Sequence, residues 1–188
     1  GFSAVAKADQ TAKEHGVGYT RILMPDALQR TLAPLWTDAI FCPSTPSGSF
    51  GKDARDLVLQ NALWADGILL PGDFGRNSET AILLDEIVRS MNSPIVITKD
   101  ALDYYLERPL TIFDKPNAII VASFSQAQKL LARAGSKDPL IYNMPLASLV
   151  GTLERFSNEH PSALVTKTDT HIIVALNGEV ATSKLEDA

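Results

Sequence analysis

The sequence predicts an α/β fold: a mainly parallel β-sheet with helices on both faces, ending in a C-terminal antiparallel hairpin. Short apolar runs rich in β-branched residues alternate with helix-forming stretches along most of the 188 residues, as strands buried between two helical layers require. Near the C-terminus, Asn177-Gly178 lies between two apolar runs and is the sequence signal of a tight hairpin turn. A chain of this length can bury about 70% of its unfolded surface, so we expect a single domain over residues 1–188.

The first half of the chain predicts helices and strands in alternation. An alanine-rich stretch at residues 3–15 precedes Gly16 and predicts a helix that the glycine ends. Composition and periodicity then predict strands at 19–24, 38–42 and 67–70, and helices at 25–32, 53–64 and 78–91. Residues 43–49, rich in proline and serine, form a predicted loop.

The second half continues this alternation and then changes it. Predicted strands occupy 95–98, 118–121 and 163–167, and predicted helical segments occupy 101–105, 126–134 and 145–160. Apolar runs at 171–176 and 179–182 flank Asn177-Gly178, which favours a type I′ turn. The parallel part of the sheet should therefore end in antiparallel strands.

The composition predicts a soluble, cytoplasmic protein. The net charge is -5 and the isoelectric point is near 5.1, which argues against nucleic acid or an anionic membrane as partner because both require a concentrated basic surface. Cys42 is the only cysteine, so no internal disulfide is expected, and the three histidines lack metal-ligand spacing. No apolar stretch approaches the roughly 20 residues that span a bilayer.

In an open parallel sheet, ligands bind at the carboxyl ends of the strands, where loops and helix N-termini face the same side. The loop at residues 71–76 (PGDFGR) connects a predicted strand to a predicted helix. Its backbone amides and Arg76 could hold an anion; alternatively, Gly72 and Gly75 only supply the positive φ of a tight turn. Asp73 favours the second interpretation, because a carboxylate repels an incoming phosphate.

Other candidate positions also have structural alternatives. Residues 47–52 (SGSFGK) end like a phosphate-binding P-loop, but Pro46 replaces its first glycine and Asp53 its magnesium-binding hydroxyl residue, so we reject that interpretation. Asp100 could accept a substrate hydroxyl or cap the turn that follows it. Lys167, at the end of an apolar strand, could bind a phosphate or simply extend its charge into solvent.

Several stretches, in order, resemble one family: the ribokinase-like ADP/ATP-dependent NAD(P)H-hydrate dehydratases, which are related to carbohydrate kinases. Residues 68–80 (ILLPGDFGRNSET) resemble V-L-I-G-P-G-L-G-R-x-x-x-T, and residues 94–102 (PIVITKDAL) resemble P-x-V-L-D-A-D-A-L. The alanine-rich segment 3–20 resembles the family's first helix and turn, residues 119–131 lie where it has a T-P-H-P-G-E segment, and residues 164–167 (LVTK) resemble V-L-K-G.

The resemblance implies a ribokinase-like three-layer sandwich, truncated at one or both ends relative to the family, and a small-molecule nucleotide or dinucleotide as ligand. It implies ADP or ATP as cofactor, with Mg²⁺ as its companion, and a homo-oligomer as a candidate assembly. The substrate-binding residues that it implies are Gly72, Gly75, Arg76, Asp100 and Ser123. Those that it implies for the nucleotide are Lys167, Thr168 and Thr170.

The departures from the family pattern fall on its chemistry. Asp73 stands at a glycine position, Thr98 replaces an aspartate, Ser123 replaces a histidine, Gln126 a glutamate, and Thr168 a glycine. The sequence also contains no T-G-x-G-D segment, which in the family supplies an anion hole and the catalytic aspartate. We therefore hypothesise a catalytically degenerate member, with catalytic residues unassigned. The alternatives are an active dehydratase (a hydro-lyase), a small-molecule kinase of the wider ribokinase group, and a non-catalytic scaffold or oligomerisation protein.

Overall fold

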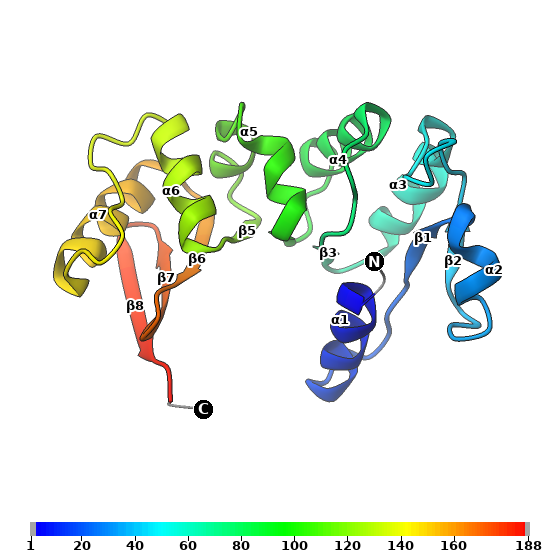
Figure 1. The fold of residues 1–188 in the computed structure, drawn as a ribbon, viewed down its shortest axis with the longest axis horizontal. Helices are drawn as coiled ribbons and strands as arrows, with labels where there is room; N and C mark the ends of the chain where they lie inside the picture. The colour runs from blue at the N-terminus through cyan, green and yellow to red at the C-terminus, as the bar shows by residue number, and fades with distance from the viewer. Residues whose placement is uncertain (1–2, 187–188) are drawn as a thin grey trace. The chain divides into compact units, whose positions relative to one another are not determined.

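The computed structural model describes residues 3–186 of the chain (Figure 1). They form two compact units, which divide between Met91 and Asn92. The single domain over residues 1–188 stays a prediction. Each unit is described by itself below.

The first unit follows the predicted order of helices and strands. The parallel pair β1 and β2 aligns Leu23 with Ile40 and Pro25 with Cys42. Both strands are shorter than predicted, with three residues each. The elements of this unit are α1 (Ser3–Glu14), β1 (Leu23–Pro25), η1 (Asp26–Leu28), α2 (Gln29–Leu32), β2 (Ile40–Cys42), η2 (Lys52–Ala54), α3 (Arg55–Trp64), β3 (Ile68–Leu70) and α4 (Ser78–Ser90).

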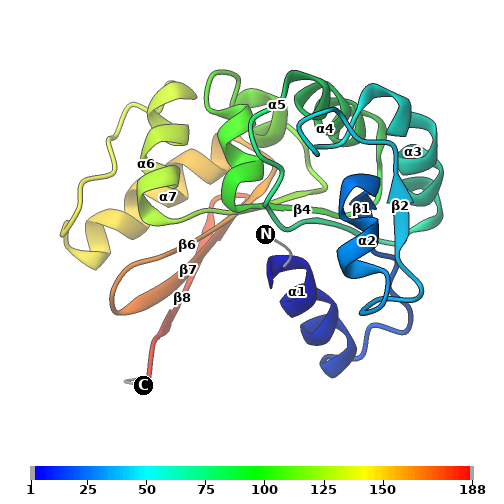
Figure 2. The ribbon, with the colours of Figure 1, turned by 45° about the vertical axis from the view of Figure 1, so that its right-hand side comes forward.

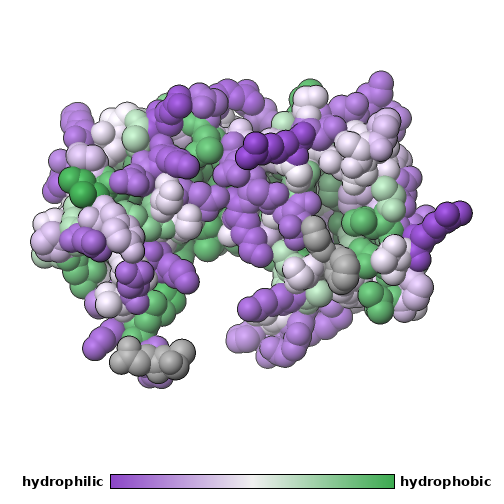
Figure 3. All heavy atoms as spheres, viewed as in Figure 1, coloured by the Kyte–Doolittle hydropathy of each residue, from purple (hydrophilic) through white to green (hydrophobic). Residues whose placement is uncertain are grey.

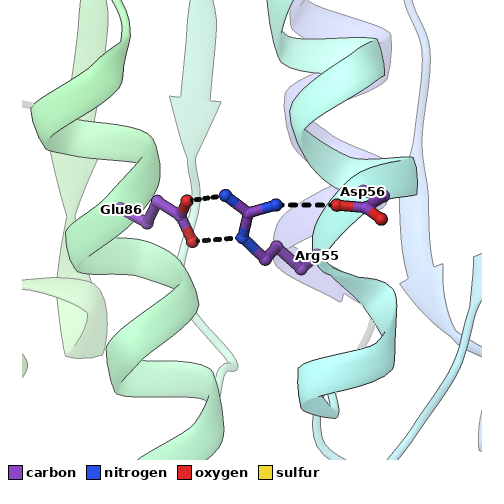
Figure 4. Close-up of polar contacts among 3 residues, drawn as sticks. All are labelled: Arg55, Asp56 and Glu86. Atoms are coloured by element: carbon purple, nitrogen blue, oxygen red, sulfur yellow. Dashed lines mark hydrogen bonds and ion pairs between the residues drawn. The ribbon is translucent and has the colours of Figure 1, made fainter.

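Helices α3 and α4 of this unit are joined by an ion pair. The guanidinium of Arg55 binds both carboxylate oxygens of Glu86 on α4, with Nε 2.8 Å from Oε2, and also reaches Asp56 at 2.7 Å (Figure 4). The hydrogen bond to Glu86 raises the pKa of Arg55. Because the ion pair is partly exposed, it contributes little to stability, whereas buried side chains of α4 such as Leu84 and Val88 contribute more.

The second unit contains the longer part of the sheet. Strands β4, β5 and β6 pair in parallel, and β6, β7 and β8 pair antiparallel. The elements are β4 (Ile95–Thr98), η3 (Lys99–Tyr105), α5 (Leu110–Phe113), β5 (Ala118–Val121), α6 (Phe124–Arg133), α7 (Leu146–Glu159), β6 (Ala163–Lys167), β7 (His171–Leu176) and β8 (Glu179–Lys184). The C-terminal antiparallel hairpin is therefore confirmed.

The hairpin turn between β7 and β8 has the predicted conformation. Asn177 and Gly178 have φ of 51° and 77°, as a type I′ turn requires. The amide of Gly178 also donates to Ser157 Oγ at 3.1 Å, and a Cβ on Gly178 would lie 3.0 Å from Asn158 Oδ1. Glycine is thus required by the backbone conformation and by the close approach of α7.

The two faces of this unit's sheet differ in burial. Side chains on one face are buried, among them Ile97, Ile120 and Ile173; α6 and α7 lie together on one side of β6–β8 (Figure 2). The alternate residues of β7 face the other way and are 38–41% exposed: Ile172, Val174 and Leu176. Hydrophobic atoms accordingly reach the surface over β7 and β8, at the lower left of Figure 3.

The element α5 was not expected from the sequence. It has only four residues, Leu110–Phe113, and buries Ile112 and Phe113. Such a short apolar segment carries no helical period, so only the packed structure reveals it. No helix within residues 3–186 is long and apolar enough to cross a membrane.

Candidate functional site

A cavity of about 370 Å³ opens in the second unit between α6, the loop that leads into α7, and the turn that joins β6 to β7. Its volume falls within the range of small-molecule sites, about 300–1,000 Å³. The cavity brings together four of the predicted site residues: Ser123, Lys167, Thr168 and Thr170. They meet because β5 and β6 are parallel neighbours, so that the segments following both strands emerge at the same edge of the sheet.

Ser123 is the N-cap of α6. Its hydroxyl accepts the Gln126 amide at 3.2 Å, and the Gln126 side chain accepts the Ser123 amide at 3.2 Å, which forms a capping box. Gln126 Nε2 also donates to the backbone carbonyl of Lys99 at 2.8 Å. The box fixes the start of α6, whose positive dipole end faces the cavity edge where Phe124 lies.

The turn after β6 is held by Thr168. Its hydroxyl accepts the backbone amides of Thr170 at 3.3 Å and His171 at 3.0 Å, and its own amide donates to the His171 carbonyl at 2.8 Å. The hydroxyl at this position, where the family has glycine, therefore closes the turn. Thr170 Oγ1 lies 2.9 Å from His171 Nδ1. Contacts of Thr168 and Thr170 with a nucleotide stay a prediction.

Aromatic side chains form one wall of the cavity. The rings of Phe124 and Tyr142 meet edge to face, with centroids 5.9 Å apart at 79°. Tyr142 donates its hydroxyl to Asp169 Oδ2 at 3.1 Å, and this hydrogen bond raises the pKa of Tyr142. Met144 and Leu149 add apolar surface. The lining of the cavity is thus partly aromatic and apolar and partly polar, with charges of both signs.

Sequence reasoning missed Phe124, Tyr142 and Asp169. Tyr142 belongs to the connection between α6 and α7, which the search for strand-end loops left out. A sequence signal exists, because Ile141-Tyr142 places two large apolar side chains in a loop, and both are more than half exposed. Asp169 lies in a searched region, yet only the folded turn shows that its carboxylate faces a hydroxyl.

The glycine loop, with Gly72, Gly75 and Arg76, lies in the first unit. Gly72 and Gly75 have φ of 98° and 71°, and Asp73 also has a positive φ, 63°. The positive φ that the sequence predicts for the two glycines is confirmed. Asp73 occupies a position that requires a left-handed backbone, which aspartate tolerates better than most residues.

The helix after this loop is capped by its own sequence. Asn77 is the N-cap of α4, and its side chain accepts the amides of Glu79 at 2.8 Å and Thr80 at 3.4 Å. These amides are among the donors that an anion would use at a helix N-terminus. Exposed Arg76 is the remaining cationic group of the predicted site, and its binding of substrate stays a prediction.

Asp100 lies in the second unit, within η3 rather than before it. The helix η3 begins at Lys99, and its N-cap is Thr98, which makes no side-chain capping bond. Asp100 is the second residue of that helix, so the N-cap position falls on Thr98 and not on Asp100. Lys99 has a positive φ of 54°, and its carbonyl is the acceptor for Gln126. The proposed contact of Asp100 with substrate stays a prediction.

The chain is similar to known proteins in sequence and in fold. No protein-family model matches the chain. The chain is 28% identical over 102 residues to the bifunctional NAD(P)H-hydrate repair enzyme Nnr of Moorella thermoacetica, and 30% identical over 103 residues to that of Salinibacter ruber. Each match covers 53% of this chain and 19% of the relative. The chain therefore matches about a fifth of the length of these curated relatives.

Solved structures extend the likeness to nearly all of the chain. A ribokinase-like superfamily protein from Enterococcus faecalis matches with a TM-score of 0.70 and 17% identity, over 95% of this chain and 57% of that one. A hypothetical protein from Streptococcus mutans matches with a TM-score of 0.67 and 15% identity, over 95% and 59%. The ribokinase-like fold is confirmed. The resemblance to NAD(P)H-hydrate repair enzymes is confirmed as a weak similarity over about half of the chain.

Proposed function

We propose that this protein is a divergent relative of the NAD(P)H-hydrate repair enzymes that binds ADP or ATP in the cavity beside α6 and has lost catalytic turnover. One observation carries the proposal: Lys167 and the N-terminus of α6 line the same cavity as an aromatic wall. A nucleotide needs these two kinds of surface, one for its phosphates and one for its base.

The polar end of the cavity suits phosphate. The ammonium of Lys167 supplies a full positive charge, and the amides of Phe124 and Ser125, which the capping box does not use, add the partial positive charge of a helix N-terminus. Ser123 and Gln126 bind each other in the capping box, which keeps that helix end rigid. A preorganised site of this kind loses little conformational entropy when its ligand binds.

The apolar end of the cavity suits a flat base. Phe124 and Tyr142 present an edge-to-face pair, and Met144 offers an adaptable thioether next to them. Aromatic and thioether side chains bind a planar ring mainly through contact area. The phosphates are therefore expected at Lys167 and the base between these side chains.

The capping box is also the argument for lost catalysis. Ser123 and Gln126 replace the family's histidine and glutamate, and neither a serine hydroxyl nor a glutamine amide is an effective general acid or base near neutral pH. Both side chains hold the start of α6. At the positions where the family has histidine and glutamate, this chain thus has a structural pair.

No group of three His, Cys, Asp or Glu side chains that could hold a metal ion occurs among residues 3–186. The described residues therefore hold no cluster that would bind Mg²⁺ through protein ligands alone. Mg²⁺ usually binds through substrate phosphates and one or two carboxylates, so we expect it only together with a nucleotide.

Thermal unfolding with ADP, ATP and NADPH tests the proposal. A ligand at 100 times its dissociation constant adds about 2.7 kcal/mol to the free energy of unfolding, which is about 5–11 °C in Tm for a protein of this size. We expect this shift with ADP or ATP. Lys167→Ala should weaken binding by about tenfold or more, since hydrogen bonds to charged groups contribute about 1.5–3 kcal/mol.

Lys129→Ala is the matched control, because Lys129 is an exposed lysine of α6 outside the cavity. It should leave the nucleotide shift unchanged. If neither ADP nor ATP raises the Tm, the proposal is overturned. Turnover of hydrated NADPH with ADP or ATP would overturn the claim that catalysis has been lost, and would favour an active dehydratase. The active dehydratase is the second candidate, supported by the similarity to the repair enzymes.

A further inference from the structure

We propose that Asp169 is a specificity-determining residue of this cavity, which selects nucleotides by accepting hydrogen bonds from the ribose 2′- and 3′-hydroxyls. The inference rests on the proposed binding of ADP or ATP and adds the group that recognises the sugar. Nothing in the family pattern of the neighbouring V-L-K-G motif requires an acid at this position.

The first argument is the fixed place of the carboxylate. Asp169 lies at the centre of the three-residue connection between β6 and β7 and lines the cavity. The hydroxyl of Thr168 accepts two backbone amides across this connection, and the Thr168 amide binds the His171 carbonyl. A side chain on a turn closed in this way is preorganised for a ligand.

The second argument is that Asp169 already binds a hydroxyl at the cavity wall. Its Oδ2 accepts the phenol of Tyr142 at 3.1 Å. An ionised carboxylate has two oxygens and about four acceptor positions, so one phenol leaves capacity for further donors. Two neighbouring hydroxyls of a ribose match the two oxygens, and an acidic residue plays this part toward ribose in other dinucleotide-binding sites.

The third argument is the distribution of charge. Phosphates are repelled by a carboxylate and attracted by Lys167 and the start of α6. The aromatic pair Phe124 and Tyr142 takes the base. The neutral sugar is then the part of a nucleotide that can lie against Asp169, and its hydroxyls supply the donors that the carboxylate needs.

The test compares ADP with 2′,3′-dideoxy-ADP by isothermal titration calorimetry on the full chain. A site built to bind a substrate hydroxyl rejects the analogue that lacks it, so wild type should bind ADP about tenfold or more tightly than the dideoxy analogue. Asp169→Asn should reduce this preference to less than about threefold. Tyr142→Phe removes the competing phenol and should keep the preference.

Each result decides a different claim. If wild type binds both nucleotides equally, or if Asp169→Asn keeps the full preference, the role of Asp169 is overturned while nucleotide binding stands. If wild type binds neither nucleotide, both proposals fail. The wild-type preference for ADP over the dideoxy analogue is measured without any variant. It therefore stays decisive even if the Asp169→Asn protein does not fold.

Discussion

Thr168→Val tests the account of the turn that joins β6 to β7. Valine matches threonine in shape but lacks the hydroxyl that accepts the amides of Thr170 at 3.3 Å and His171 at 3.0 Å. Two hydrogen bonds are lost, each contributing about 0.5–1.5 kcal/mol, and water can replace part of them because Thr170 is exposed. We expect a loss of about 1–2 kcal/mol in the free energy of unfolding.

This loss corresponds to about 2–8 °C in Tm for a chain of this size, measurable by urea and thermal unfolding. Thr168→Ser is the matched control, since it keeps the hydroxyl, and it should stay within about 0.5 kcal/mol of wild type. Affinity for ADP should fall in the valine variant because the turn also carries Asp169 and Lys167. Equal stability of the valine and serine variants would refute the role of the hydroxyl.

Two further predictions concern other parts of the structure. Gln126→Glu restores the family's acidic residue, yet it should destabilise the protein by about 1–2 kcal/mol, because the carboxylate cannot donate to the Lys99 carbonyl as the amide does at 2.8 Å; a variant as stable as wild type in urea unfolding would contradict this. Burial raises the pKa of the Cys42 thiol to about 11 from 9.0. The folded protein therefore favours the protonated thiol. Cys42 contributes its full stabilisation below pH 9, and this contribution is lost as the pH rises from 9 to 11. Cys42→Ala should show a smaller decline over this range in unfolding measured against pH, and an identical decline would contradict the assignment.

The strands could be predicted well where burial on the sheet dictates composition. Residues 95–98, 118–121, 163–167 and 171–176 were predicted as strands with the bounds that the structure has. These segments are continuous or alternating runs of β-branched residues, whose pattern reflects the sheet directly. Residues 19–24 begin with tyrosine, threonine and arginine before the apolar part, and the strand that pairs with a neighbour is Leu23–Pro25.

The site could be predicted where topology decides it. Ser123 and Lys167 follow neighbouring parallel strands, so their proximity follows from the fold alone. Tyr142 reaches the cavity from a loop between helices, and no periodicity indicates where such a loop folds. Its contact with Asp169 spans 27 residues and depends on tertiary packing, which a local pattern does not encode.

Asp73 shows how the residue type can mislead. Its charge predicts a weakened anion site, and this stays a prediction. Its φ of 63° adds a conformational reason, because the turn requires a left-handed residue and aspartate is one of the few non-glycine types that adopt this conformation routinely. The sequence alone does not separate these two causes.

The central claim is that a nucleotide binds between the N-terminus of α6 and the end of β6, and amide hydrogen exchange with and without ADP tests it most directly. The account predicts that ADP slows exchange at residues 123–126 and 167–171, the two segments that meet at the cavity, and that Lys167→Ala removes most of this protection. Protection confined to residues 71–77, or none in either segment at saturating ADP, would contradict it.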